Sequence, residues 1–305
     1  MNDTRRAVLD ALADGPVSGP ELAERLDVSR NAVWKHVEAL REAGYEIETT
    51  NKGYVLGEAS EFGPTVEYGL DAPFEVEYHE SIGSTNDRAR NLAADGAKDV
   101  VVLADEQVGG RGRLDREWVG PSGGVWMSIV LRPNLPPAHV PLLTLAAAVA
   151  VTRAAREAGV PAEIKWPNDV LVGEEKLAGI LTEMEGEADR VSWIVVGIGV
   201  NVNVPGASLP EGATSVQEAA GSVNRRIFVQ RLLEEFDALR ANTDDVLGAW
   251  RERAATLGQR VRIETRDGDV IGNAVDVVTP GALVVATDDG EVRVHAGDCE
   301  HLRPV

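Results

Sequence analysis

The stretch EIKWPNDVLVGEEKLAGIL, residues 163–181, decides how the middle of this chain folds. Its two apolar runs predict strands over residues 163–166 and 176–184, with a turn at Gly173 between them. Lys165 and Lys176, two of only five lysines in 305 residues, flank the pair Asn168 and Asp169. A lysine can hold phosphate charge, and an aspartate can hold Mg²⁺ or accept a proton. The stretch therefore predicts an anion-handling site beside two strands, and the alternative is a surface turn with incidental lysines.

Similar patterns on both sides of this stretch predict a mixed α/β central domain. Four more strands are expected, over residues 74–79, 100–106, 124–131 and 190–201. Helices are expected over residues 85–94, 142–158, 225–239 and 244–255.

The first 56 residues carry the pattern of a winged helix-turn-helix. Cap and turn residues set off three helices, expected over residues 4–13, 18–26 and 29–44. Val33, Val37 and Leu40 recur at i, i+4 and i+7 and predict the buried stripe of the third helix. Residues 45–56 read as a β-hairpin, which makes the wing.

The third helix leaves a polar face for which DNA is the expected partner. Arginine and asparagine can contact guanine and adenine edges in the major groove, and lysines can reach phosphates. Residues 1–56 hold ten acidic and seven basic side chains, so nonspecific attraction to DNA is weak and base contacts must contribute more. The expected DNA-binding residues are Ser29, Arg30, Asn31, Trp34, Lys35 and Lys52. The alternative is a unit that serves only dimerisation or packing.

The C-terminal part changes to short alternating runs separated by Asp-Gly and Pro-Gly turns, which predict a small all-β barrel. Residues 57–73 carry glycine, proline and acids without a clear period, so we expect a linker there. The expected division is residues 1–57 for DNA binding, 58–73 for the linker, 74–257 for the central domain and 258–305 for the barrel.

Composition limits the class of protein. The net charge is −20 with the acids spread along the chain, a halophile-like balance that suits solubility at high salt. The longest apolar stretch, Val140–Val151, is too short to cross a bilayer, and the N-terminus lacks a secretory pattern, so we expect a cytoplasmic protein without a membrane span. The single cysteine, Cys299, excludes an internal disulfide and a cysteine-type zinc site.

Three further motifs place polar residues beside predicted strands. STN, residues 84–86, either caps a helix or binds a small polar ligand. Gln107 leads into GGRGR, residues 109–113, where glycines allow close backbone approach and arginine forks match carboxylate and phosphate oxygens. A solvated arginine loop is the alternative. GIGVNVN, residues 197–203, reads as a buried strand whose glycines permit either close strand packing or ligand contact. The sequence has no Walker element, so a nucleotide would be held by another device.

Taken in order, STN, QxxGRGRxxRxW, KWPND, KLAGIL and GIGVNVN resemble the motifs of the biotin protein ligases. The resemblance covers the whole chain, because bifunctional members that also repress the biotin operon add a winged helix-turn-helix and an SH3-like barrel. It implies an α+β fold and a biotin--[acetyl-CoA-carboxylase] ligase that uses ATP and Mg²⁺ to form biotinyl-5′-AMP. The acceptor would be a lysine of a biotin carboxyl carrier domain. A homodimer, operator DNA and biotinyl-5′-AMP as corepressor are also implied.

The resemblance further implies roles for individual residues. Those expected to bind biotin or its adenylate are Ser84, Thr85, Asn86, Gln107, Arg111, Gly112, Arg113, Asn168 and Lys176. The expected catalytic set is Lys176, Arg113, Asp169 and Lys165. Lys176 would contact the carboxylate or mixed-anhydride oxygen, and Asp169 would assist the acceptor lysine and hold Mg²⁺.

One position departs from the family pattern, GRGRxGRxW. Asp115 stands where the later glycine belongs, so the resemblance would put a carboxylate beside the adenylate. Retention of the adenylate is the property that we expect this difference to alter first. Two rival functions remain open. A lipoate-type ligase shares the catalytic chemistry, and a biotin-sensing transcription factor would have lost ligation.

Overall fold

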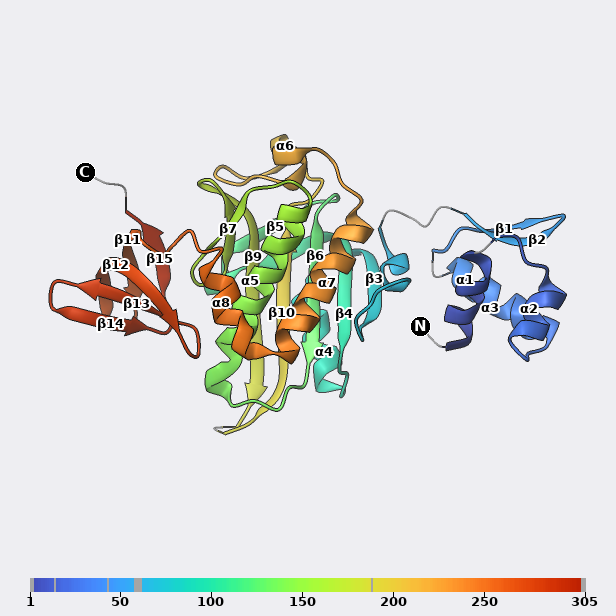
Figure 1. Cartoon of the computed structure of the whole chain (residues 1–305), viewed down its shortest axis with the longest axis horizontal. Coiled ribbons are helices and arrows are strands. Elements are labelled where there is room, and N and C mark those ends of the chain that lie inside the picture. The colour runs from blue at the N-terminus through green and yellow to red at the C-terminus, as the bar shows by residue number, and fades with distance from the viewer. Residues whose placement is uncertain (1–2, 14, 43, 58–61, 188, 303–305) are drawn as a thin grey trace.

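The computed structural model describes residues 3–13, 15–42, 44–57, 62–187 and 189–302. They form three units in a row (Figure 1): a helical unit with a hairpin, a large sheet covered by helices, and a small all-β unit. This is the α+β architecture that the sequence predicts.

The N-terminal unit is the predicted winged helix-turn-helix. Its elements are α1 (Asp3–Ala13), α2 (Gly19–Arg25), α3 (Arg30–Glu42), β1 (Ile47–Thr50) and β2 (Gly53–Leu56). Val33, Val37 and Leu40 are buried as the stripe predicted. The Ser29 hydroxyl accepts the backbone N–H of Ala32 at 3.1 Å, which is the capping bond expected at the start of α3.

The segment predicted as a linker is partly folded. Residues 58–61 lie outside the described residues, but Pro64–Glu67 forms a 3-10 helix (η1). Phe62, Val66 and Leu70 are buried in the core of the central unit. Tyr68 packs edge-on against Tyr45 of the winged unit, with ring centroids 6.2 Å apart. Periodicity misses this order because the burial comes from tertiary contacts rather than from a regular element.

The central unit is an eight-stranded sheet. Its strands are β3 (Glu75–Ile82), β4 (Val100–Arg111), β5 (Glu117–Gly120), β6 (Val125–Leu131), β7 (Ala162–Lys165), β8 (Asp169–Val172), β9 (Glu175–Gly186) and β10 (Val191–Val200). Their order is β3-β4-β6-β10-β9-β8-β7, with β5 paired to β4. Only the β3–β4 pair is parallel among the described strands.

Helices cover both faces of this sheet. The helices of the central unit are α4 (Thr85–Ala94), α5 (Val140–Glu157), α6 (Val216–Ala220), α7 (Arg225–Ala241) and α8 (Val246–Arg251), with 3-10 turns at Pro137–His139 (η3), Gly206–Ser208 (η4) and Thr243–Asp245 (η5). Val102 of β4 faces α4, whereas its neighbours Val101 and Leu103 belong to the core under α5 and α7. This alternation is the period-2 pattern of a strand buried on both faces. Figure 1 shows α5, α7 and α8 lying across one face of the sheet.

The sequence predicts that the longest apolar stretch is too short to cross a bilayer, and the length of helix α5 corrects this expectation. Together with η3 it spans Pro137–Glu157, which is long and apolar enough to cross a membrane by length and composition. Most of that helix is buried inside the protein, so it is the central core helix of the middle unit.

The boundaries of several elements also differ from those predicted. The sequence does not predict β5, β8 and α6, because four or five residues are too few to show a period. The helix expected over residues 244–255 is shorter, since η5 precedes it and α8 ends at Arg251. The strand expected over residues 100–106 continues to Arg111, because β5 pairs with its second half.

The C-terminal unit is the predicted all-β module. Strands β11 (Arg260–Thr265), β12 (Gly268–Val278), β13 (Ala282–Thr287), β14 (Gly290–Val294) and β15 (Asp298–His301) pair in the order β14-β13-β12-β11-β15. The indole N–H of Trp166 donates to the Gly281 carbonyl at 3.1 Å, and its backbone N–H donates to the Thr256 hydroxyl at 2.9 Å. Trp166, the aromatic residue of KWPND, therefore fastens this unit to the central sheet.

The buried Cys299 gives a test of how this module packs. Burial raises the pKa of its thiol to about 11, although nearby Lys165 acts in the opposite direction. At pH 8 the thiol is therefore protonated and inaccessible, and thiolate is the reactive form. We expect a small thiol reagent to leave the native protein unmodified and to react rapidly once guanidinium unfolds it. Reaction of the native protein at the rate of a free cysteine would contradict this packing.

Candidate functional site

A cavity of about 420 Å³ opens beside β9 and β10, within the size range of small-molecule sites. Residues from all the central motifs line it. The sequence-predicted ones are Ser84, Thr85, Asn86, Gln107, Arg111, Gly112, Arg113, Asn168, Asp169 and Lys176. The fold thus brings ten of the eleven predicted ligand and catalytic residues to one place, and Lys165 is the exception.

The floor of the cavity is a strip of glycines. Gly179 of β9 and Gly199 of β10 are direct partners across the two strands. A Cβ at Gly199 would lie 2.8 Å from the indole of Trp118, and a Cβ at Gly197 would overlap the side-chain oxygen of Asn86. These glycines therefore leave room for side chains that reach over the strands from β5 and α4.

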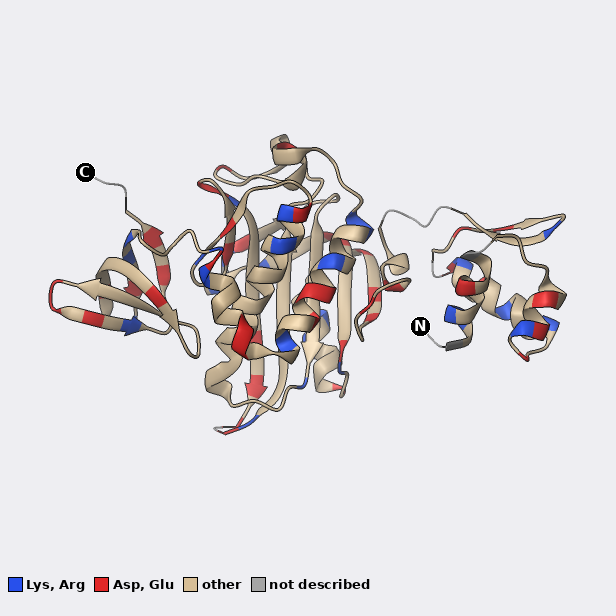
Figure 2. Cartoon of the chain, in the orientation of Figure 1, with Lys and Arg blue, Asp and Glu red and all other residues tan. Residues whose placement is uncertain are grey.

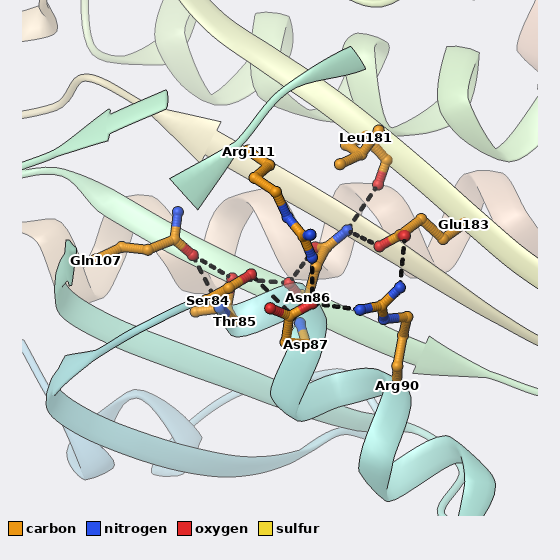
Figure 3. A network of polar contacts seen from close by, with 10 residues as sticks. Ser84, Thr85, Asn86, Asp87, Arg90, Gln107, Arg111, Leu181 and Glu183 are labelled. Atoms are coloured by element: carbon orange, nitrogen blue, oxygen red, sulfur yellow. Dashed lines mark hydrogen bonds and ion pairs between the residues drawn. The ribbon is translucent and has the colours of Figure 1, made fainter. Parts of the chain in front are cut away.

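The STN motif lies at the start of α4, where it both caps the helix and lines the cavity (Figure 3). The Ser84 hydroxyl accepts the N–H of Asp87 at 3.3 Å. Thr85 donates to Oε1 of Gln107 twice, from its backbone N–H at 2.8 Å and from its hydroxyl at 3.0 Å. With its oxygen occupied in this way, Gln107 keeps its amide NH₂ as the group available to a ligand.

Asn86 differs from its two neighbours because its amide is already engaged inside the protein. Its Oδ1 accepts from the Ser128 hydroxyl at 2.6 Å, and its Nδ2 donates to Glu183 Oε2 at 2.8 Å. Only 8% of the residue is exposed. The geometry suits Asn86 to holding α4 in place against the cavity floor better than to direct contact with a ligand.

Lys176 and Asp169 form an ion pair on the wall of the cavity. Nζ of Lys176 lies 2.8 Å from Oδ1 of Asp169 and 5.2 Å from the centre of the Trp118 ring, a distance typical of a cation–π contact. Trp118 stands on β5 and packs edge-on against Trp126. An ammonium, a carboxylate and two indole rings therefore share one side of the cavity.

The glycine- and arginine-rich stretch is shorter as a loop than the sequence predicts. Gly110 pairs with Trp118, and Arg111 pairs with Glu117, so β4 and β5 make a hairpin over the cavity. Its turn contains a 3-10 segment (η2, Arg113–Asp115) and places Leu114 in the left-handed region at φ +56° with its side chain exposed. The side chain of Asp115, the departure from the family pattern, lies outside the described part of the structure.

The arginines of this hairpin are engaged on two sides. Arg111 contacts Asp87 of α4. Arg113 donates to Asn168 Oδ1 at 2.8 Å and to the carbonyl of Gly297, in the C-terminal module, at 2.7 Å. Arg116 donates to Asp298 of the same module at 2.5 Å. The hairpin turn is thus in contact with both the central sheet and the C-terminal module.

Lys165 lies in a neighbouring hollow rather than in the cavity. Arg116, Asp169 and Asp298 line both spaces, and Lys165 shares the hollow with Arg262, Cys299 and other residues of β11 and β15. Burial, and after it the positive charge of Lys165, lower the pKa of His301 nearby. Lys165 is the last residue of β7 and pairs with Asp169 of β8, yet it lies in the hollow beside β11 and β15, a placement that sequence order alone does not reveal.

Asp169 can supply one carboxylate to a magnesium ion, but not a complete protein site. Among the residues that the structure describes, no group of three His, Cys, Asp or Glu side chains gathers as metal ligands. Mg²⁺ commonly takes one or two carboxylates and completes its shell with water and substrate phosphates. The donor set therefore fits a metal that arrives with a nucleotide.

The predicted DNA-binding residues are all exposed on the N-terminal unit. Ser29 caps the start of α3, and Arg30, Asn31, Trp34 and Lys35 are exposed on the helix, with Trp34 at 52%. Lys52 is exposed at the tip of the hairpin wing. Figure 2 shows acidic and basic residues interspersed over this unit.

Several residues of the cavity are absent from the sequence-based set. They are Arg116, Trp118, Trp126, Gly179, Gly197, Gly199, Asn201 and Asp298. Trp118 and the glycines belong to the quoted motifs, so the motifs pointed to them. They were left out of the predicted site because an indole and a glycine carry no charged group. Asp298 carried none, because only the tertiary fold brings the C-terminal module to the arginine turn.

Comparisons with known proteins agree for all three units of the chain. Residues 78–201 match the biotin/lipoate A/B protein ligase family, residues 4–55 match an HTH domain, and residues 256–302 match the biotin protein ligase C-terminal domain. A bifunctional ligase/repressor BirA from Bacillus subtilis is 38% identical, with 93% of each chain covered. A biotin--[acetyl-CoA-carboxylase] ligase from Mycobacterium tuberculosis is 36% identical over 72% of this chain and 86% of its own. The structure of an Aquifex aeolicus biotin protein ligase in complex with biotin and ATP gives a TM-score of 0.63 at 26% identity, covering 75% of this chain and 99% of that one.

The glycine floor gives the sharpest test of the cavity. Gly199→Ala places a methyl group against the Trp118 indole, so we expect the KM for the acid substrate to rise at least tenfold. Gly248→Ala is the matched control, because a Cβ there meets open space. Steady-state kinetics and thermal unfolding of both variants separate a local effect from general destabilisation. Unchanged kinetics in Gly199→Ala would show that Trp118 does not shape the site.

Proposed function

The chain belongs to the biotin protein ligase family, and from that membership we infer a bifunctional protein that ligates biotin and represses transcription. Its enzymatic part is a biotin--[acetyl-CoA-carboxylase] ligase that uses ATP. A relative of bifunctional type matches 93% of the chain, and the chain's own helix-turn-helix is matched separately over residues 4–55. The observation that carries the proposal is the cavity itself, where cationic groups of Lys176, Arg111 and Arg113 meet an apolar wall of Trp118 and Trp126. Such a wall suits the fused rings and the carbon chain of biotin.

In the first step the carboxylate oxygen of biotin attacks the α-phosphorus of ATP. The bond to the β-phosphate oxygen breaks, and pyrophosphate leaves with the electron pair. Two anions must approach for this to happen, so their repulsion has to be offset by fixed positive charge. Lys176 and the arginines of the hairpin turn supply that charge. The Gln107 amide NH₂ and the Ser84 hydroxyl can donate hydrogen bonds that orient biotin, and the Thr85 hydroxyl, which already donates to Gln107, can accept one.

In the second step the amine of a carrier lysine attacks the carbonyl carbon of biotinyl-5′-AMP. The amide bond forms, and AMP leaves with its phosphate oxygen. The amine must be neutral to attack, and Asp169 stands beside Lys176 where it can take that proton. A bound Mg²⁺ would neutralise phosphate charge, with Asp169 giving one oxygen.

The two rival functions make different demands on the cavity. A ligand sensor needs affinity for biotin but has no use for the Lys176–Asp169 pair. A lipoate-type ligase needs the same cations, but it would normally lack the combination of a GRGR turn and a winged helix-turn-helix. The presence of all these features in one chain favours the ligase with a DNA-binding unit.

The remaining assignments follow from the same membership. We assign DNA binding to residues 1–57, catalysis to 74–257 and a supporting role to the module of residues 258–305, with biotinyl-5′-AMP as corepressor and a cytoplasmic location. The protein is proposed to be a homodimer that associates through the central unit. Exposed Val108 and Val119 on the β4–β5 hairpin support this, because they offer apolar surface beside the cavity. The acidic surface suits a saline cytoplasm.

Pyrophosphate release tests the enzymatic proposal. We expect release with biotin and ATP, at least a hundredfold faster than with lipoate and ATP at equal concentration. Intact-mass measurement of an added carrier domain should then show one biotinyl group. Release with lipoate and ATP but not with biotin and ATP would identify the chain as a lipoate-type ligase. Release with neither acid would favour the biotin-sensing transcription factor.

Arg113 tests the covering role of the hairpin turn. Arg113→Gly removes the contacts to Asn168 and to the Gly297 carbonyl, so we expect faster escape of biotinyl-5′-AMP and biotinylation of proteins other than the carrier. Arg266→Gly is the control, since this exposed arginine lies in the β11–β12 turn. If Arg113→Gly neither released adenylate nor relaxed acceptor choice, the covering role would be wrong.

DNA binding is tested on the DNA upstream of the protein's own coding sequence and of its carrier. Arg30→Ala and Asn31→Ala should lower affinity for the preferred sequence more than for random DNA. Lys52→Ala should weaken both equally and reduce the salt slope by about one. Equal binding of the unaltered protein to all sequences would rule out the repressor while leaving the ligase intact.

A further inference from the structure

The turn over the cavity is tied down at both ends. On one side Arg111 contacts Asp87, in the first turn of α4. On the other side Arg113 and Arg116 contact Gly297 and Asp298 at the start of β15. Residues 112–116, of which Gly112, Arg113 and Arg116 line the cavity, therefore lie between two anchors that are far apart in the sequence.

The anchor on α4 belongs to a network of alternating charges (Figure 3). Asp87 accepts from Arg111 and also from Arg90. Arg90 reaches Glu183 of β9 at 3.2 Å, and Glu183 holds Asn86 at 2.8 Å. If Arg111 moves, Asp87 keeps a cationic partner in Arg90. The Arg111–Asp87 contact can therefore open and close at small cost.

The contact leaves Arg111 able to bind a second anion. Only its Nη2 is engaged by Asp87, so Nε and Nη1 remain as donors on a residue that lines the cavity. Arg113, by contrast, uses both of its terminal nitrogens. Asp87 thus orients the guanidinium of Arg111 and leaves two of its nitrogens free to donate to a ligand.

The anchor on the C-terminal module is built from backbone as well as side chain. A Cβ at Gly297 would overlap the side chain of Ile263, so this position has no room for anything larger than glycine. Its carbonyl is thereby presented to Arg113, and the next residue, Asp298, takes Arg116.

We propose that Asp87 and Asp298 are positioning residues that hold the arginine turn closed over the adenylate from opposite sides and so set how long the intermediate stays bound. The proposal rests on the ligase function given above. Neither residue needs to touch the reacting atoms, because each acts through an arginine. The side chains of both pairs are about two-fifths to three-fifths exposed, so each tie contributes modestly and is weakened by salt.

The residence time of biotinyl-5′-AMP made in place from labelled biotin and ATP tests the proposal. The loaded full-length protein is freed of substrates by gel filtration, and release is followed without a carrier. Asp87→Asn and Asp298→Asn should each release the adenylate about 1.5- to 5-fold faster than the unaltered protein. Asp95→Asn is the control, because this exposed aspartate at the end of α4 has the same charge on the same helix.

Two further readouts separate positioning from damage to the fold. Asp87→Asn should keep the unfolding temperature of the unaltered protein, and Asp87→Glu should restore slow release. Raising sodium chloride from 0.1 M to 1 M should speed release from the unaltered protein and have less effect on Asp87→Asn.

Unchanged release in both asparagine variants would overturn the proposal, as would an equal increase in Asp95→Asn. Faster release that tracks a fall in unfolding temperature, without rescue by glutamate, would also overturn it. Failure of the unaltered protein to form any adenylate would instead contradict the ligase function.

Discussion

The arrangement of the site depends on three glycines in the floor of the cavity, which leave a strip of backbone without side chains. Gly179 and Gly199 face each other on β9 and β10, and Gly197 lies two residues earlier on the same strand. Because nothing projects from this strip, Trp118 can lie across it from β5, and Asn86 can reach it from α4. Those two placements in turn fix Lys176 against an aromatic ring and Gln107 against Thr85. A methyl group at either of the β10 glycines would therefore be felt by several ligand-facing residues at once.

The cationic groups of the cavity are held by internal anions and carbonyls in a protein of net charge −20. Asp87 engages Arg111, Asp169 engages Lys176, and Asp298 engages Arg116. Each pair keeps a positive charge at a defined place before any substrate arrives, which reduces the reorganisation needed when an anionic intermediate forms. The same acidic surface explains why the helix-turn-helix must rely on base contacts, since its own unit carries little attraction for phosphate.

Much of this molecule could be predicted from sequence where the signal is local. The capping serines, the buried stripe of α3 and the exact span of α4 follow from spacing and cap residues, and the five motifs fix the family. What the sequence could not give depends on contacts between distant segments. β5 is too short to show a period, yet its pairing with β4 turns a presumed glycine loop into a hairpin. Residues 62–73 read as a linker because their burial is tertiary. Lys165 pairs with Asp169 across β7 and β8, but it lies in the hollow beside the C-terminal module and not in the cavity. Asp298 belongs to no motif, and only the tertiary fold brings it to the cavity.

If one cavity on the glycine strip holds the activated intermediate, a structure of the protein with a nonhydrolysable biotinyl-adenylate analogue should show it there. We expect the analogue to lie between Trp118 and the β10 glycines, with the Gln107 amide NH₂ and Lys176 within hydrogen-bond distance of it and the arginine turn closed above. An analogue bound elsewhere, or one in the cavity that contacts neither Gln107 nor Lys176, would contradict it.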